Sequence, residues 1–138
     1  MKLKNIKISN YRCFKEAEID FDDHITLVVG KNGAGKTAIL DAVAVAVSTF
    51  LLGIDGGVSR SILKDDARYE FHDLNGTIDP QHQFPVSIES IGDCLDQLNV
   101  KWERSLNSES GKTTIKDAGE LTSLAKKAQN QIMTGDKS

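Results

Sequence analysis

The residues with the clearest chemical signature lie near the N-terminus, where eight consecutive positions match the phosphate-binding pattern G-x-x-x-x-G-K-S/T. They are Gly30, Lys31, Asn32, Gly33, Ala34, Gly35, Lys36 and Thr37. Glycines allow a backbone in which several N–H groups point at one anion, and a following helix adds its positive end. In such a loop the lysine neutralises the β- and γ-phosphates and the threonine hydroxyl holds Mg²⁺. The pattern therefore predicts a nucleotide site with Lys36 and Thr37 in these two roles.

The flanking residues supply the elements that such a loop needs. Residues 25–29 are β-branched and apolar, as in a buried strand, and residues 38–52 are rich in alanine and leucine, as in a helix. Because residues 42–47 are apolar nearly all round, this helix is predicted to pack between two layers. Residues 3–9 and 17–21 alternate apolar and polar side chains, which predicts a small antiparallel ribbon. The order predicts an α/β fold of the P-loop NTPase class.

The rest of the chain has a different pattern. Glycines at 53, 56 and 57 end the helix, and residues 58–82 show little periodicity, which predicts a loop or an inserted lobe. Three strands are predicted at 85–91, 100–106 and 113–115, and Asp117 and Glu120 have the spacing of a capping box that begins a final helix ending near Gly135. We therefore expect one lobe over residues 1–138. Its parts are a P-loop core (1–54), a loop or inserted region (55–84), and strands with a terminal helix (85–135).

Composition excludes several classes. The 138 residues carry a net charge of −3, which argues against an extended nucleic-acid surface. The start lacks the apolar stretch of a signal peptide, and the most apolar run, 38–52, is interrupted by Asp41 and is short for a bilayer, so a cytoplasmic protein without a membrane span is expected. Cys13 and Cys94 are too few for a disulfide framework, and both are predicted to be reduced, packed thiols.

The N-terminal motifs resemble those of a known group of ATPases. A strand, the sequence Asn-Tyr-Arg-Cys-Phe at 10–14, a second strand ending Asp-Phe at 20–21, and the loop G-x-N-G-A-G-K-T resemble the N-terminus of the RecF/SMC/OLD-type ATPases with ABC-like heads. Within that group, residues 1–53 resemble the PtuA-type ATPases of anti-phage defence. The resemblance implies the N-terminal lobe of a head that binds ATP and Mg²⁺ and forms head-to-head homodimers driven by ATP. Such heads act on DNA or control a partner nuclease.

The resemblance also assigns single residues. Arg12 matches the basic residue that reaches the nucleotide phosphates, and Asn32 matches the asparagine that shapes the phosphate cradle. Family members carry a glutamine that helps to hold magnesium and senses the γ-phosphate. Gln83 is a candidate for this role, with Gln81 and Gln97 as alternatives.

Two family motifs have no match, so no catalytic residue is assigned. A Walker B strand would end in Asp-Glu, yet the nearest sequence, 61–66, has Lys64 within its apolar run and no glutamate. The signature motif is missing too. The chain is therefore expected to be part of an ATPase, to need the remainder of the head, and to hydrolyse ATP negligibly alone.

Two other functions stay open from the sequence. One is a nucleotide sensor or regulatory binding module that does not hydrolyse ATP. The other is a small phosphotransferase, which is disfavoured because no arginine-rich lid follows the loop at a suitable spacing. His24, His72 and His82 lack metal-ligand spacing. Trp102 lies in a predicted strand and is interpreted as a core residue, with a base-stacking platform as the alternative.

Overall fold

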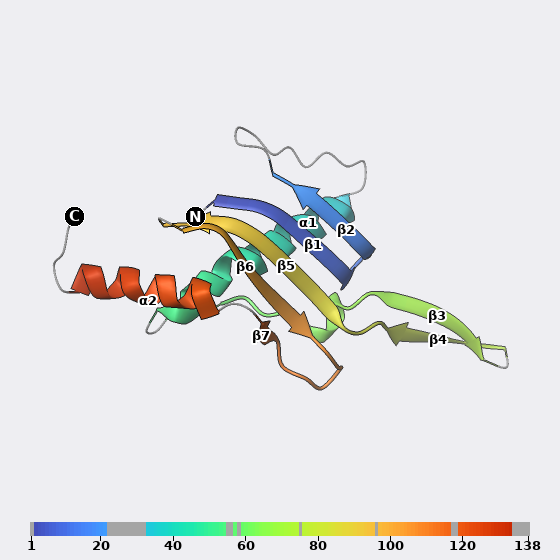
Figure 1. The fold of residues 1–138 in the computed structure, drawn as a ribbon. Coiled ribbons are helices and arrows are strands. Elements are labelled where there is room, and N and C mark those ends of the chain that lie inside the picture. The colour runs from blue at the N-terminus through green and yellow to red at the C-terminus, as the bar shows by residue number, and fades with distance from the viewer. Residues whose placement is uncertain are drawn as a thin grey trace.

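A computed structural model describes residues 2–21, 33–54, 57, 59–74, 76–95, 97–116 and 119–133 (Figure 1). Its elements in chain order are β1 (Lys2–Tyr11), β2 (Phe14–Asp20), α1 (Gly33–Ser48), η1 (Thr49–Gly53), η2 (Lys64–Asp66), β3 (Tyr69–Leu74), β4 (Thr77–His82), β5 (Val86–Cys94), β6 (Gln97–Leu106), β7 (Thr114–Lys116) and α2 (Gly119–Met133). The predicted strand at 25–29 lies outside the described residues.

The centre of the fold is a five-stranded antiparallel sheet in the order β2-β1-β5-β6-β7. The predicted ribbon is confirmed, because β1 and β2 pair from Asn5 with Asp20 to Tyr11 with Phe14. Alternation along β1 buries Ile6 and Ile8 on one face of the sheet. The strands predicted at 85–91, 100–106 and 113–115 are also confirmed, as β5, β6 and β7.

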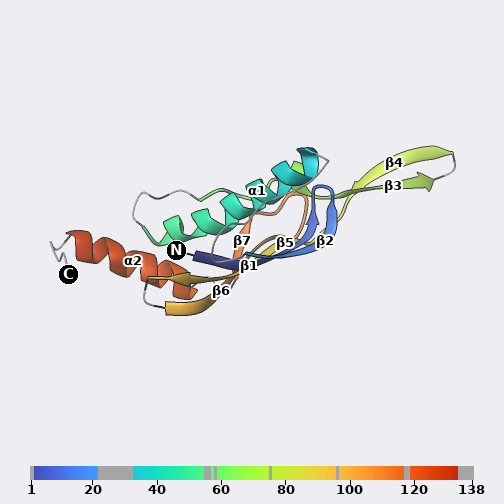
Figure 2. The same cartoon turned by 90° about the horizontal axis from the view of Figure 1, so that it is seen from above.

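Helix α1 covers one face of this sheet (Figure 2). Its sheet-facing side is made of small residues, which let the helix approach the strands closely: Ala38, Ala42, Val45 and Ala46 are all buried. On the other side of the helix, Leu40 is 52% exposed and Val47 is 41% exposed. Within the described residues, the predicted packing of α1 between two layers is therefore confirmed only for the side that faces the sheet.

The apolar helical stretch around α1 is longer than the run of residues 38–52 that was predicted from the sequence. Residues Gly35–Gly53, through α1 and η1, form a helical run of 19 residues with a mean hydropathy of 1.6. By length and composition alone such a run could cross a membrane, so the prediction that this stretch is too short to cross a bilayer was wrong. The packing decides its role here, because Trp102 Nε1 donates a 2.9 Å hydrogen bond to the Ala46 carbonyl from the sheet below. We therefore describe α1 as a core helix.

A second core lies where α2 packs on η1 and β6. Its members are buried apolar residues: Cys94, Val100, Trp102, Leu121 and Leu124. The predicted final helix is confirmed and ends at Met133, while Asp117 of the proposed capping box lies outside the described residues. The prediction of packed thiols is right for buried Cys94 and wrong for Cys13, which is exposed in the turn between β1 and β2.

The inserted region contains more regular structure than predicted. Strands β3 and β4 pair from Tyr69 with His82 to Leu74 with Thr77, and they form a hairpin that projects from the end of the sheet remote from α2 (Figures 1 and 2). Of the two predicted alternatives, a loop and an inserted lobe, the loop is wrong for this part and the hairpin agrees with the inserted lobe. Its strands gave no clear pattern because exposed side chains such as Phe71 need no alternation with polar residues. Gly76, with φ of 81°, makes the tight connection.

Candidate nucleotide-binding site

The phosphate-binding pattern runs into the first turn of α1. The structure describes Gly33–Thr37 of the eight predicted residues, whereas Gly30, Lys31 and Asn32 lie outside the described part, as does the side chain of Ala34. A helix of 16 residues presents unpaired N–H groups and a positive dipole end at this position. Lys36 and Thr37 are both exposed there. The described residues thus place the lysine and the threonine at an accessible, anion-favouring helix end.

The turn between β1 and β2 lies against the same helix end. A Cβ atom added to Gly35 would lie 3.7 Å from Cζ of Phe14, the first residue of β2. Arg12 occupies this turn in the left-handed region, with φ of 51°. The structure therefore brings Arg12, which the sequence separates from the loop, to the helix that begins with the loop.

The Arg12 guanidinium makes two ion pairs with carboxylates from different elements. Its Nη1 lies 2.5 Å from Asp41 Oδ2 on α1, and its Nε lies 3.0 Å from Asp66 Oδ1 on η2. The other Asp41 oxygen lies 3.1 Å from Arg60 Nη1. We call Arg12, Asp41, Arg60 and Asp66 the Arg12 cluster. Because Asp41 follows Thr37 by four residues, both share one face of α1, and the cluster lies one helical turn from the threonine.

Charge pairing keeps two members of the Arg12 cluster ionised at neutral pH. Burial alone would raise the pKa of Asp41, but hydrogen bonds and positive charge from Arg12 and Arg60 hold that pKa below its usual value. Burial would lower the pKa of Arg12, and the bonds to Asp41 and Asp66 raise it overall. Beside them, burial and then the Asp66 charge raise the pKa of Tyr11 to about 12, so its hydroxyl stays neutral.

Asp66 has a structural role that the sequence did not indicate. Its Oδ2 accepts a 2.9 Å bond from the Leu63 N–H, and its backbone carbonyl accepts a 2.6 Å bond from the Arg12 N–H. Both carboxylate oxygens are therefore occupied by groups of the protein. Asp41 was also missed as a site residue. The available signal was that it is the single charged residue between positions 38 and 52.

The three candidate glutamines lie on other elements. Gln83 follows β4, where its N–H donates to the Arg68 carbonyl at 2.8 Å and its Nε2 donates to the Gln81 carbonyl at 3.2 Å. Gln81 is in β4, and Gln97 is the first residue of β6. These bonds of Gln83 stay at the base of the hairpin. Its assignment as a magnesium ligand remains a prediction. Among the described residues, no group of three or more His, Cys, Asp or Glu side chains is placed to hold a metal ion.

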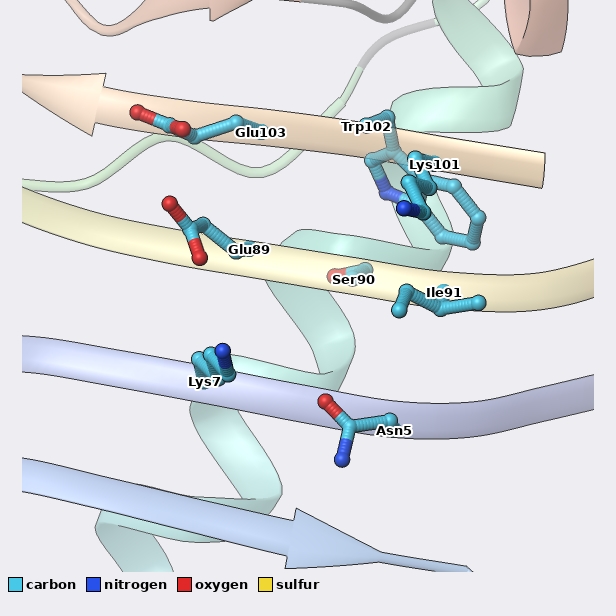
Figure 3. A pocket seen from close by; sticks show the side chains of 8 residues that line it. All are labelled: Asn5, Lys7, Glu89, Ser90, Ile91, Lys101, Trp102 and Glu103. Carbon is cyan, nitrogen blue, oxygen red and sulfur yellow. The ribbon is translucent and has the colours of Figure 1, made fainter. Parts of the chain in front are cut away.

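A hollow on the face of the sheet that α1 leaves open is distinct from the Arg12 cluster (Figure 3). Lys7 pairs in register with Glu89, and Glu89 pairs with Glu103, so positive and negative side chains form a row across the strands. Lys101 adds a second positive charge. This mixture does not make a basic surface for nucleic acid. Trp102 is 1% exposed, which confirms it as a core residue and not a stacking platform.

Comparisons with known proteins agree with this arrangement. Residues 5–135 match a protein family described as an AAA domain. A DNA double-strand break repair Rad50 ATPase from Archaeoglobus fulgidus is 48% identical over 44 residues, which make up 32% of this chain and 5% of the relative. A DNA replication and repair protein RecF from Flavobacterium johnsoniae is 51% identical over 43 residues, or 31% of this chain and 12% of the relative.

A longer match covers more of the chain. The RecF protein of Actinobacillus pleuropneumoniae is 31% identical over 104 residues, which span 72% of this chain and 27% of the relative. The chain thus spans from 5% to 27% of the length of these three relatives.

The fold itself is also known. A chain from work on ATP-driven dimerization and DNA stimulated activation of SMC ATPases superposes with a TM-score of 0.58 at 18% identity, and the match covers 100% of this chain and 92% of that one. This likeness confirms the predicted fold, the α/β N-terminal lobe of an ABC-like ATPase head with an antiparallel ribbon.

Proposed function

Because the chain belongs to the AAA-domain family that it matches over residues 5–135, we propose that it is the ATP-binding lobe of a RecF/SMC-like ATPase. The observation that carries the proposal is the start of α1. The G-K-T end of the phosphate-binding pattern forms the first helical turn there, with Lys36 and Thr37 exposed. Helix N–H groups, a lysine and a hydroxyl at one accessible point are the groups that bind polyphosphate with Mg²⁺.

Each residue of the site then has a role. Lys36 neutralises the β- and γ-phosphates, Thr37 holds Mg²⁺, and the N–H groups of the loop from Gly30 to Gly35 cradle the phosphates. Arg12 adds a positive charge from the turn between β1 and β2, where it pairs with Asp41, one helical turn beyond Thr37 on α1. Asn32 shapes the loop. Gln83 is kept as a candidate magnesium ligand. Mg²⁺ supplies charge neutralisation at the phosphates when it is bound.

The full-length protein is proposed to couple ATP binding to DNA processing. Support comes from the Rad50 and RecF relatives, which are repair proteins, and from the structural neighbour, which belongs to work on ATP-driven dimerization. By analogy, two heads would associate head to head when ATP is bound and control DNA processing or a partner nuclease. An anti-phage role and a cytoplasmic location belong to the same proposal, and the motif resemblance of residues 1–53 supports the first.

The alternative of a module that binds nucleotide without hydrolysing it gains from one observation. A carboxylate can act as general base only when it is available to the attacking water, and both carboxylates of the Arg12 cluster are engaged by arginines. We therefore expect the 138-residue chain alone to bind ATP and to turn it over negligibly.

The proposal is tested by Lys36→Ala in the full chain. Removing the ammonium group should weaken MgATP binding at least about tenfold, because charge-assisted bonds to phosphate contribute about 1.5–3 kcal/mol. Titration with a fluorescent ATP analogue measures this, and circular dichroism checks that the fold is kept. Lys127→Ala, at an exposed position on α2, is the matched control and should bind like wild type. Equal affinity of the two variants contradicts the proposed site.

A further inference from the structure

Asp66 fixes the base of the Arg12 side chain. The Arg12 N–H donates to the Asp66 carbonyl at 2.6 Å and Nε donates to Asp66 Oδ1 at 3.0 Å, so backbone and side chain are held by one residue. Asp66 is in turn held by the Leu63 N–H and is 8% exposed. This double contact, together with the left-handed φ of Arg12, determines where the side chain starts.

Asp41 determines where the guanidinium ends. It bonds Nη1 at 2.5 Å from a position on α1 that lies one turn beyond Thr37. A guanidinium carries five N–H donors in a rigid fork, and the bonds to the two aspartates use Nε and Nη1. Within the described part of the chain, Nη2 has no hydrogen-bond partner, and the Arg12 side chain is 29% exposed. Arg12 can therefore offer Nη2 to an anion without leaving either aspartate.

Arg60 offsets the negative charge that Asp41 would otherwise place beside an anion site. Asp41 alone would repel phosphate, but its Oδ1 lies 3.1 Å from Arg60 Nη1, so two arginines face two aspartates in the Arg12 cluster. The cluster is neutral without nucleotide. Arg60 is half exposed and is held to the α1 region by its backbone N–H, which donates to Ser48 Oγ at 2.8 Å.

We propose that Asp41 is a positioning residue that aims the Nη2 edge of Arg12 at the nucleotide phosphates, and that Arg60 cancels the charge that Asp41 would otherwise present to them. This inference rests on the proposed function. The phosphates contact Arg12, whereas Asp41 and Arg60 act through it. Removing the Asp41 charge would then have two opposite effects on MgATP affinity. The loss of a negative charge near phosphate would strengthen binding, and the loss of the contact that orients Arg12 would weaken it.

The sign of the effect of Asp41→Asn tests this. Positioning predicts that MgATP binds about three- to tenfold more weakly to the variant, the size typical of coupling between contacting groups. Charge alone predicts tighter binding. In the Arg12→Ala background the same substitution should cause no loss, because there is no guanidinium left to aim. Asp41→Glu, which keeps the carboxylate, should recover part of the affinity.

Arg60→Ala gives a second, independent variant that leaves the Arg12 and Asp41 pair intact. It should weaken MgATP binding about two- to threefold, and this loss should disappear in the Asp41→Asn background. Melting curves of each variant confirm folding, and binding is measured by the same ATP-analogue titration with the full chain.

The outcomes distinguish this inference from the proposed function. Binding to Asp41→Asn that equals or exceeds wild type overturns the positioning role, and so does an equal loss with and without Arg12. If wild type binds ATP and Lys36→Ala does not, the proposed function stands whatever Asp41 does. A wild-type chain that binds no MgATP overturns both.

Discussion

The sheet with α1 and the β3–β4 hairpin are both built from antiparallel strands, but they differ in what covers them. In the sheet, one face is sealed by α1 and α2, and residues such as Ile88 and Val86 have no exposed surface. In the hairpin, the strands pair along their length, yet Phe71 is 72% exposed and Tyr69 is 45% exposed. Strand pairing alone buries little apolar surface, and an isolated hairpin is marginal in water. The sheet therefore carries the stability of the fold.

The hairpin matters through its base. The Arg68 N–H donates to the Asn10 carbonyl at 2.9 Å, and Tyr11 bridges to Ala67. These contacts tie the segment before β3 to the end of β1, next to Arg12. The tip projects away from the sheet (Figure 2). The inserted hairpin therefore has a base that helps to place the Arg12 cluster and a tip that projects away from it.

The largest effect is expected at Trp102, where the sheet meets both helices. Trp102→Ala removes a side chain that is 1% exposed and packs beside Leu121, so we expect a loss of about 3–5 kcal/mol in the free energy of unfolding. Urea denaturation followed by circular dichroism measures it. Trp102→Phe, which loses the 2.9 Å bond to the Ala46 carbonyl but keeps an aromatic ring, should cost less. Equal costs would mean that the bond, and not the packing, is dominant.

Gly53→Ala tests the second core. A Cβ atom at Gly53 would lie 2.0 Å from the Thr122 carbonyl oxygen, so α2 must shift away from η1. Such overpacking costs about 1–3 kcal/mol. Gly119→Ala is the matched control, because nothing lies within 4 Å of its added methyl group at the start of α2. Thermal melts compare the two. A Gly53→Ala chain as stable as the control would show that α2 does not pack on η1 as described.

The same difference in covering explains what could be predicted from the sequence. Strand β1 was predicted because Ile6 and Ile8 alternate with polar residues over a covered face. The two strands of the hairpin were not predicted, although an inserted lobe was one of the alternatives, because Phe71 is exposed and no alternation of apolar and polar residues is required. For the site, Lys36 and Thr37 follow from a local pattern. The partners of Arg12 do not, because Asp41 and Asp66 are 29 and 54 positions further along the chain and meet it only through tertiary structure.

The smallest effect is expected in the β3–β4 hairpin, at Phe71→Ser, because Phe71 lies midway along β3, where it pairs with Pro80. Because the side chain is 72% exposed, the free energy of unfolding should change by less than about 0.5 kcal/mol. Ile88→Val is the comparison in the sheet. It removes a single methylene from a fully buried position and should cost about 0.5–1.5 kcal/mol. Urea denaturation at two protein concentrations measures both. If Phe71→Ser cost more than Ile88→Val, the aromatic side chain would be buried in solution by another surface. A cost that grows with protein concentration would identify that surface as a second copy of the chain.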